Sequence, residues 1–347
     1  MKTERIRVSI GSAVKLGLKN IALDVAPTNC HLLTYHPSGC EGNCGFCPQS
    51  RYTYKKLNQM EDSQEFLSRV MWPDFSFKRV LSVFEDEFSS FSIDETGFQR
   101  ICLQSLNYDG FKDDVFEITE ALSSVTSIPI SLAIPPVPLN YLKIYKDAGI
   151  DRICFAIDAC REDLFTDVKG ETHGGPYRWD EHLKLLKQAV EIFDRRRVTT
   201  HLIVGLGETE CDALKFISFM KGMGVLTGLF AFYPIKNTRF SDRRRPSLSK
   251  FRKIQLGKYL IDSGRKSFTD FTFTPEGSVS SFGINGKLLR DIIDLSTPFE
   301  TSGCPGCNRP FYTSSPREEQ YNYPRPLKFN EKEMVFNELI IYCRKDE

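Results

Sequence analysis

The stretch Cys40-Glu-Gly-Asn-Cys44-Gly-Phe46-Cys47 places three cysteines on one short loop, with three and then two residues between them. Three such thiolates can ligate three irons of a [4Fe–4S] cluster and leave its fourth iron open to another ligand. The alternatives are a zinc site or three unrelated thiols, because two cysteines separated by two residues also bind zinc. Nothing near the triplet supplies a clean fourth zinc ligand, so the spacing favours an iron–sulfur cluster on Cys40, Cys44 and Cys47.

The composition excludes several classes of protein. A net charge of +1 gives no global field that would attract nucleic acid or an anionic membrane. No uninterrupted apolar stretch approaches the roughly 20 residues that span a bilayer, and no apolar signal peptide follows the first residues. Eleven cysteines, an odd number, in a chain of 347 residues do not resemble a disulfide framework. We therefore expect a cytoplasmic protein with reduced thiols and without nucleic-acid or membrane partners.

Short β-branched or aromatic runs alternate with helix-like segments through the middle of the chain. This pattern is typical of parallel βαβ units, and about six of them predict an α/β fold with a partial (β/α)6 barrel. We expect an N-terminal cap over residues 1–27, the barrel over 28–297, and an irregular, cysteine-bearing tail over 298–347. The predicted strands are 31–35, 100–106, 128–134, 152–158, 198–205, 226–233 and 269–274, and the clearest helices are 113–123, 139–148, 179–193 and 210–223.

The cysteine loop follows the first barrel strand, and barrels of this kind carry their chemistry at the carboxyl ends of the strands. Asp158 ends another strand, where it either faces the barrel interior or caps the following helix. The segment Gly205-Leu-Gly207-Glu208 lies between a strand and a helix. Its glycines permit close approach of the backbone and its helix start offers N–H groups to a ligand, although a plain tight turn has the same sequence features.

The tail carries a second candidate pair in Cys304-Pro-Gly-Cys307. Two thiols do not complete a [4Fe–4S] cluster, and Cys30 at the head of the first strand is a candidate third ligand. A zinc knuckle with other ligands is the alternative for the pair, and a buried strand thiol is the alternative for Cys30. The remaining cysteines show no ligand-like spacing and are interpreted as packing residues: Cys102, Cys154, Cys160, Cys211 and Cys343.

Five segments of the chain form one pattern: Leu-Leu-Thr-Tyr at 32–35, Cys-Gly-Phe-Cys-Pro-Gln at 44–49, His-Leu-Ile-Val-Gly-Leu-Gly-Glu-Thr-Glu at 201–210, Leu-Phe-Ala-Phe-Tyr-Pro-Ile at 229–235 and Cys-Pro-Gly-Cys-Asn-Arg-Pro-Phe-Tyr at 304–312. Together they resemble the radical S-adenosylmethionine (SAM) superfamily, and within it the biotin-synthase-like proteins that form subunits of split, two-protein lipoyl synthases. The resemblance covers roughly residues 28–325.

The resemblance implies that SAM binds the open iron and is cleaved there by an electron from a ferredoxin or flavodoxin. It also implies sulfur insertion into an octanoyl chain on a lipoyl-carrier protein or peptide, with a second, auxiliary [4Fe–4S] cluster as the sulfur source and a second subunit as a possible partner. The implied SAM contacts are Phe46, Asp158, Gly205, Gly207 and Glu208, and the implied auxiliary ligands are Cys304, Cys307 and Cys30.

The sequence departs from both neighbouring enzyme types. Biotin synthase holds a [2Fe–2S] cluster on strand cysteines and an arginine, and one of those cysteines would fall at Thr199 here. Single-chain lipoyl synthase uses a serine ligand in an Arg-Ser-Ser-Tyr run, whereas Ser314-Ser315 is followed by Pro316. Biotin-synthase-type sulfur insertion and a non-catalytic iron–sulfur or zinc protein stay open as alternatives, and the thiolated carbon is not identified by the sequence.

Overall fold

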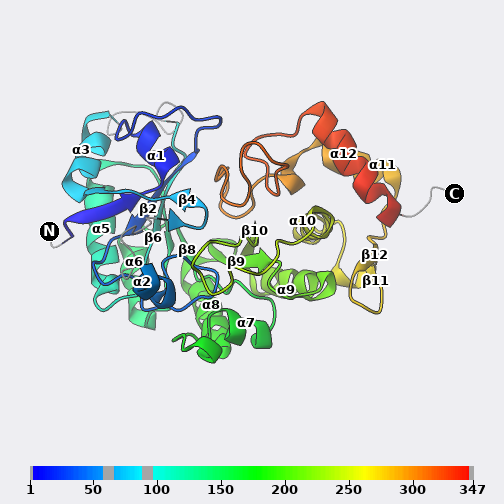
Figure 1. Cartoon of the computed structure of the whole chain (residues 1–347), viewed down its shortest axis with the longest axis horizontal. Helices are drawn as coiled ribbons and strands as arrows, with labels where there is room; N and C mark the ends of the chain where they lie inside the picture. Colours follow the sequence, from blue (N-terminus) through cyan, green and yellow to red (C-terminus); the bar gives the residue numbers. More distant parts are fainter. Residues whose placement is uncertain (1–2, 58–65, 88–96, 344–347) are drawn as a thin grey trace.

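A central sheet organises the computed structural model, which describes residues 3–57, 66–87 and 97–343 (Figure 1). The strand order is β10-β9-β8-β7-β6-β2-β1-β5. The six strands from β10 to β2 run parallel, whereas β1 and β5 are antiparallel additions beyond β2. The predicted α/β fold with a partial (β/α)6 barrel is confirmed.

The sheet strands are β1 (Arg5–Val8), β2 (Asn29–Thr34), β5 (Asp74–Ser76), β6 (Arg100–Gln104), β7 (Ile130–Ala133), β8 (Arg152–Cys154), β9 (Val198–Val204) and β10 (Leu226–Ala231). Two small hairpins lie outside the sheet, β3 (Phe66–Leu67) with β4 (Val70–Met71) and β11 (Thr272–Phe273) with β12 (Val279–Ser281). The six predicted barrel strands are therefore all present, but the seventh predicted strand, 269–274, belongs to a separate hairpin.

The α-helices are α1 (Ile10–Lys15), α2 (Arg51–Leu57), α3 (Phe77–Glu87), α5 (Phe111–Val125), α6 (Leu139–Asp147), α7 (Glu162–Val168), α8 (Trp179–Phe193), α9 (Glu210–Met223), α10 (Leu248–Asp262), α11 (Gly286–Asp294) and α12 (Phe329–Leu339). Single 3-10 turns are η1 (Glu171–His173), η2 (Phe268–Asp270), η3 (Thr297–Phe299) and η4 (Ile340–Tyr342). Helices α8 and α9 begin and end at the predicted residues. Apolar residues recur at helical spacing in α8, and a capping box marks the start of α9.

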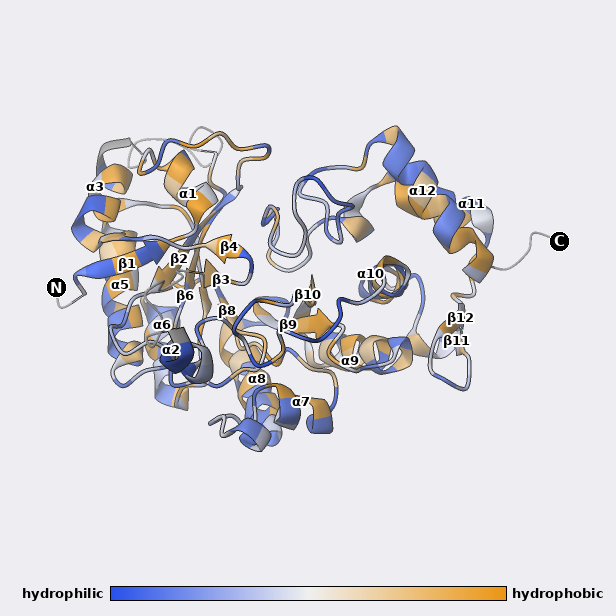
Figure 2. Ribbon diagram, viewed as in Figure 1, coloured by the Kyte–Doolittle hydropathy of each residue, from blue (hydrophilic) through white to orange (hydrophobic). Residues whose placement is uncertain are grey.

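Two predictions about the ends of the barrel region need correction. The N-terminal segment does more than cap the barrel, since β1 pairs with β2 and extends the sheet. The tail is less irregular than expected, because α12 packs against α11 and α10 in the right-hand lobe of Figure 1. A continuous apolar core runs from β1 to α12, and in Figure 2 helices such as α9 and α12 carry both apolar and hydrophilic colours.

The tail returns to the barrel and covers the free edge of β10. The Ser302 hydroxyl accepts a hydrogen bond from Leu229 N at 2.8 Å, and the Asn322 side-chain amide donates to Leu229 O at 3.1 Å. These side chains satisfy backbone groups that an edge strand would otherwise expose. The tail also reaches the opposite side of the barrel opening, where Thr28 N donates to the Asn308 side chain at 2.9 Å.

Across the described ranges, no helix is both long enough and apolar enough to cross a bilayer.

Candidate active site

A pocket opens at the carboxyl ends of the barrel strands and encloses about 1310 Å³ of empty space, including its open mouth. All three cysteines of the loop line it, together with Phe46 and Asp158. The structure thus brings the sequence-predicted triplet and two of the predicted SAM contacts to one site. The lining is mainly apolar away from the cysteines and includes Leu33, Leu67, Leu106, Ile134, Ile203, Phe230, Phe232 and Ile235.

Backbone hydrogen bonds fix the cysteine loop to its surroundings. Gly45 N donates to Val168 O at 2.8 Å, and Gly45 O accepts from Phe240 N at 2.9 Å. A Cβ on Gly45 would lie 2.5 Å from the Phe240 ring, so only glycine fits there without movement of the ring. The Cys40 sulfur accepts from Gly42 N and Asn107 N, each at 3.3 Å. The loop is therefore held in shape by neighbouring elements as well as by its own turns.

A buried ion pair lies beside the loop. The Lys169 ammonium donates to the Asp158 carboxylate at 2.8 Å and to Ala156 O at 2.6 Å, and both charged side chains are less than a tenth exposed. Burial acts to lower the pKa of Lys169, but the Asp158 carboxylate and the Cys44 sulfur outweigh it and raise that pKa. Lys169 therefore carries a positive charge next to the cysteine loop.

Asp158 itself has a φ of 67°, in the left-handed region that favours glycine or asparagine-like residues. Its backbone is held there by hydrogen bonds from Asp158 N to His201 O and from Ile203 N to Asp158 O. It does not cap the following helix, because the N-cap of α7 is Arg161. The helix-cap alternative is thus wrong, and the interior-facing interpretation of Asp158 is the one that the geometry supports.

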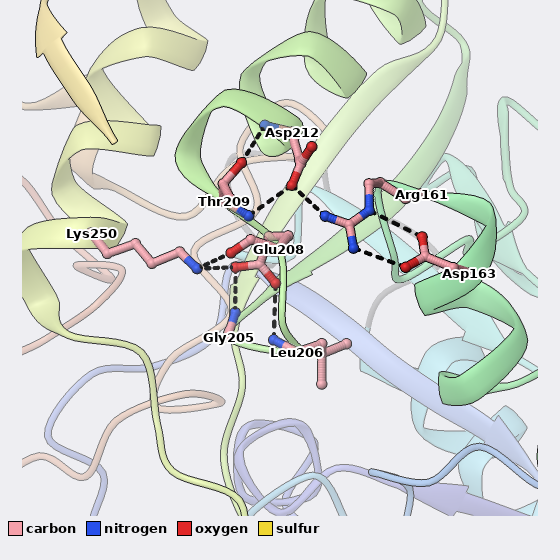
Figure 3. Close-up of polar contacts among 8 residues, drawn as sticks. All are labelled: Arg161, Asp163, Gly205, Leu206, Glu208, Thr209, Asp212 and Lys250. Carbon is pink, nitrogen blue, oxygen red and sulfur yellow. Dashed lines mark hydrogen bonds and ion pairs between the residues drawn. The ribbon is translucent and has the colours of Figure 1, made fainter. Parts of the chain in front are cut away.

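The turn between β9 and α9 differs from its predicted role. The Glu208 carboxylate accepts from Gly205 N and from Leu206 N, each at 2.9 Å, and it pairs with Lys250 at 2.6 Å (Figure 3). The backbone N–H groups of Gly205 and Leu206 are therefore engaged by the chain's own carboxylate and are not open to a ligand. Gly205, Gly207 and Glu208 do not line the pocket.

This turn instead positions the pocket wall. Thr209 caps α9 and Asp212 closes the capping box, and Arg161 bridges Asp212 to Asp163 on α7 (Figure 3). Leu206 is buried in a small apolar cluster with Phe232 and Phe240, against which Phe46 packs. The segment supports the position of Phe46, and direct contact of its glycines with SAM is not supported.

The sequence of the barrel region matches the family model of the radical SAM superfamily over residues 34–220, which is more than half of the chain. The chain belongs to the radical SAM superfamily. Membership implies a [4Fe–4S] cluster and SAM, and the thiols of Cys40, Cys44 and Cys47 in one pocket are a donor set that suits such a cluster. Burial raises the pKa of the Cys44 thiol to about 12, and the Lys169 charge opposes that shift.

The solved structures that this radical SAM chain resembles are diverse. The hydrogenase maturase HydG from Carboxydothermus hydrogenoformans is 20% identical, with a TM-score of 0.48 over 65% of this chain and 50% of that one. Coproporphyrinogen III oxidase (HemN) from Escherichia coli is 15% identical, with a TM-score of 0.42 over 67% and 51%. A radical SAM methyltransferase from Sphaerobacter thermophilus is 13% identical, with a TM-score of 0.45 over 70% and 66%.

The chain thus spans about half the length of the HydG and HemN chains. No curated protein matches the sequence.

A second, smaller pocket lies inside the barrel, toward the amino ends of the strands. Both tail cysteines, Cys304 and Cys307, line it, and so do Cys102 of β6 and Cys154 of β8. Ala133, His201, Phe230 and Arg309 line both pockets, so these four residues form a shared wall. Cys102 and Cys154 are buried, as expected of packing residues, but they also lie in the same pocket as the tail cysteines.

Cys30 is absent from this group. It lies on β2 between Asn29 and His31, and its sulfur faces the outer side of the sheet, where the Ser12 and Lys15 side chains of α1 lie nearby. The structure does not bring Cys30 to the tail cysteines, because alternate residues of a strand point to opposite faces and Asn29 faces the inner pocket.

The serines of the tail are also engaged elsewhere. The Ser314 hydroxyl accepts from Tyr321 N at 3.0 Å, and the Ser315 hydroxyl accepts from Arg317 N at 3.3 Å. Neither serine lines the inner pocket. In the described part of the chain, no three His, Cys, Asp or Glu side chains converge as closely as a single metal ion requires. The zinc-knuckle alternative for the tail pair therefore finds no support there.

Two residues of the site had no signal in the sequence, and a third was visible only within a longer motif. Lys169 sits at the C-cap of α7 without a motif, although its charge lies beside the cysteine loop and pairs with Asp158. Tyr177 lies against the loop, and burial together with the Cys44 and Cys40 sulfurs raises its pKa well above the usual value. Arg309 was visible only as part of the tail motif, and its place inside the barrel depends on the return of the tail.

Proposed function

We propose that this radical SAM enzyme inserts sulfur into an aliphatic carbon of a protein-bound octanoyl chain, as lipoyl synthases do, and uses an auxiliary [4Fe–4S] cluster as the sulfur source. The observation that carries the proposal is the return of the tail, which brings Cys304 and Cys307 beneath the pocket that holds the cysteine loop. A sulfur source on one side of the substrate and a radical source on the other is the arrangement that sulfur insertion needs.

The chain's own residues have defined tasks in this proposal. Cys40, Cys44 and Cys47 hold the cluster that, with SAM, supplies the radical chemistry when bound. Asp158 and Lys169 are the oppositely charged side chains next to that cluster, and they suit the ribose hydroxyls and the carboxylate of SAM. The apolar wall of Ile134, Phe230 and Phe232 excludes water and suits an alkyl chain.

The proposed partners are an octanoylated lipoyl-carrier protein or peptide, a low-potential electron donor such as ferredoxin or flavodoxin, and a second lipoyl synthase subunit. The proposed place of work is the cytoplasm, where a reduced cluster and free thiols persist. The open mouth of the large pocket lies at the strand ends and gives an octanoyl-lysine arm access to the apolar wall.

The test is an anaerobic reaction with SAM, dithionite and an octanoyl-lysine peptide, read by mass spectrometry. The wild type is expected to form methionine, 5′-deoxyadenosine and a thiolated peptide, whereas Cys307→Ala should still cleave SAM but insert no sulfur. Cys211→Ala is the matched control, since Cys211 lies on α9 away from both pockets. Thiolated peptide at the wild-type level from Cys307→Ala would refute the auxiliary-cluster role.

One observation favours a second candidate, sulfur insertion of the biotin-synthase type. A strand cysteine, Cys102, and an arginine, Arg309, lie together inside the barrel, as that resemblance would require. Thr199 lines the same pocket where a further cysteine would be needed. Dethiobiotin in place of the octanoyl peptide separates the two candidates: thiolation of dethiobiotin alone would replace the lipoyl proposal.

A further inference from the structure

The inner pocket gathers four thiols from three distant parts of the chain. Cys102 comes from β6, Cys154 from the end of β8, and Cys304 and Cys307 from the tail. The other described cysteines outside the loop, which are Cys30, Cys160, Cys211 and Cys343, line neither pocket. Burial raises the pKa of Cys102 to about 12, and its electrostatic neighbours are Arg309 and the three other thiols of this group. The four sulfurs thus form one cluster of side chains.

Strand register explains why the two strand cysteines face inward together. Cys102 pairs with Ser131 of β7, and Cys154 pairs with Thr199 of β9, and all four residues line the inner pocket. The Cys304 sulfur lies 3.7 Å from the Ser131 hydroxyl, and the Cys154 sulfur lies 3.4 Å from His201 Nε2. The tail cysteines therefore reach the same layer of the barrel as the strand cysteines.

The charge of Arg309 points to an anionic occupant. Its guanidinium lies over the rings of Phe230 and Tyr312, and its Nε is buried without a hydrogen-bond partner. Across the described residues, Arg309 forms no salt bridge with a carboxylate. A cation inside a barrel is stabilised by a nearby anion, and the groups that can become anionic around it are the Cys102, Cys304 and Cys307 thiols and Tyr312.

We infer that Cys102 and Cys154 complete, with Cys304 and Cys307, a four-thiolate site for one iron–sulfur cluster in the barrel interior. A cubane cluster takes one thiolate on each of its four irons, and four thiolates are what the pocket offers. The thiols do not converge on one point as a mononuclear ion would require among the described residues, and a polynuclear cluster needs ligands that stand further apart. Arg309 offsets the negative charge of the assembled cluster.

The inference names the ligands of the auxiliary cluster and rests on the proposed function only for the use of that cluster as a sulfur source. The wall of His201, Phe230 and Arg309 separates this site from the large pocket, and all three line both.

Iron binding is tested in a Cys40→Ala/Cys44→Ala/Cys47→Ala background, which removes the loop ligands and leaves the inner site to be counted. After anaerobic reconstitution with iron and sulfide, this variant should hold about four irons with a cubane Mössbauer signal. Adding Cys102→Ser or Cys154→Ser should lower the iron content to about three or fewer and give the signal of a cluster that lacks one ligand. Adding Cys211→Ser is the control and should change nothing.

Serine keeps the size of the side chain, and circular dichroism checks that each variant is folded. If the triple background does not fold, the same substitutions in the wild type should lower the iron content from about eight to about seven or fewer. If Cys102→Ser and Cys154→Ser in the triple background both keep four irons with an unchanged Mössbauer signal, the inference is overturned. Zinc in place of iron at the inner site would also overturn it. In the wild type, which keeps the loop cysteines, an intact four-iron inner cluster that yields no thiolated peptide would instead refute the proposed function and leave the ligand assignment standing.

Discussion

The buried pair of Asp158 and Lys169 gives a prediction whose size follows from the structure. The two charges are 2.8 Å apart and both side chains are less than a tenth exposed. At an effective dielectric constant of about 20, their attraction is on the order of 6 kcal/mol, most of which offsets the cost of removing the charges from water. Loss of one partner leaves the other buried and unpaired, which costs about 3–5 kcal/mol.

We therefore expect Asp158→Asn and Lys169→Met each to lower the free energy of unfolding of the apo protein by about 3 kcal/mol or more. Asparagine tolerates the positive φ of position 158, so the backbone adds little to that loss. The double variant has no unpaired charge and should be less destabilised than the sum of the two singles by about 2 kcal/mol or more. All three variants should lose SAM binding.

Urea unfolding followed by circular dichroism measures the free energies, and equilibrium dialysis measures SAM binding. The control cycle is Lys332→Met with Asp294→Asn, an exposed pair that is 3.4 Å apart and should couple by less than about 1 kcal/mol. If the double variant loses as much unfolding free energy as the two single variants together, the two charges are not coupled and the reasoning is refuted. Full SAM affinity in Lys169→Met would refute the role of this pair in the site.

Three further predictions follow from single contacts. Gly45→Ala places a Cβ 2.5 Å from the Phe240 ring, so the amount of iron bound by the cysteine loop after reconstitution should fall at least twofold. The double variant Gly45→Ala/Phe240→Ala removes that ring and should restore the iron content. Glu208→Gln leaves one oxygen for two backbone N–H groups and should lower the free energy of unfolding by about 1–3 kcal/mol with unchanged iron content; an unchanged stability would contradict the role of the turn. Burial, and after it the charge of Lys169, lowers the pKa of His182 in the folded protein to about 3, whereas the pKa in the unfolded chain is about 6.5. Below pH 6.5 the unfolded chain therefore binds more protons than the folded one, and the free energy of unfolding falls as the pH falls. The loss between pH 7 and 5 should be roughly 2 kcal/mol greater in the wild type than in His182→Asn, and equal pH profiles would count against it.

The sequence predicted those features of the fold that depend on residues close together in the chain. The cysteine triplet lies within eight residues, so its shared pocket follows from the chain itself, and the six barrel strands follow from apolar runs between helices. Residues Cys102 and Cys154 were missed because their partners lie about 150–200 positions away, and only closure of the barrel and return of the tail bring them together.

Orientation was the other missing information. Strand β2 is buried on both faces, so its apolar pattern does not tell which of Cys30 and His31 points inward. The Gly205–Glu208 turn looked open to a ligand because sequence does not show that the Glu208 carboxylate folds back onto the N–H groups of its own turn. Both errors concern the direction of a side chain at a correctly placed position.

The tail contacts described above also set an order of assembly. Residues 302–309 follow every barrel strand in the chain and are therefore synthesised after them. Until Asn308 docks on Thr28 and Ser302 docks on β10, the amino ends of the strands have no cover from this segment. Before docking, Cys102 and Cys154 are not covered from that side by this segment, so we expect the inner cluster to be inserted more easily before the tail docks than after. If that cluster gives up its sulfur in each reaction, release of the tail would help to renew it.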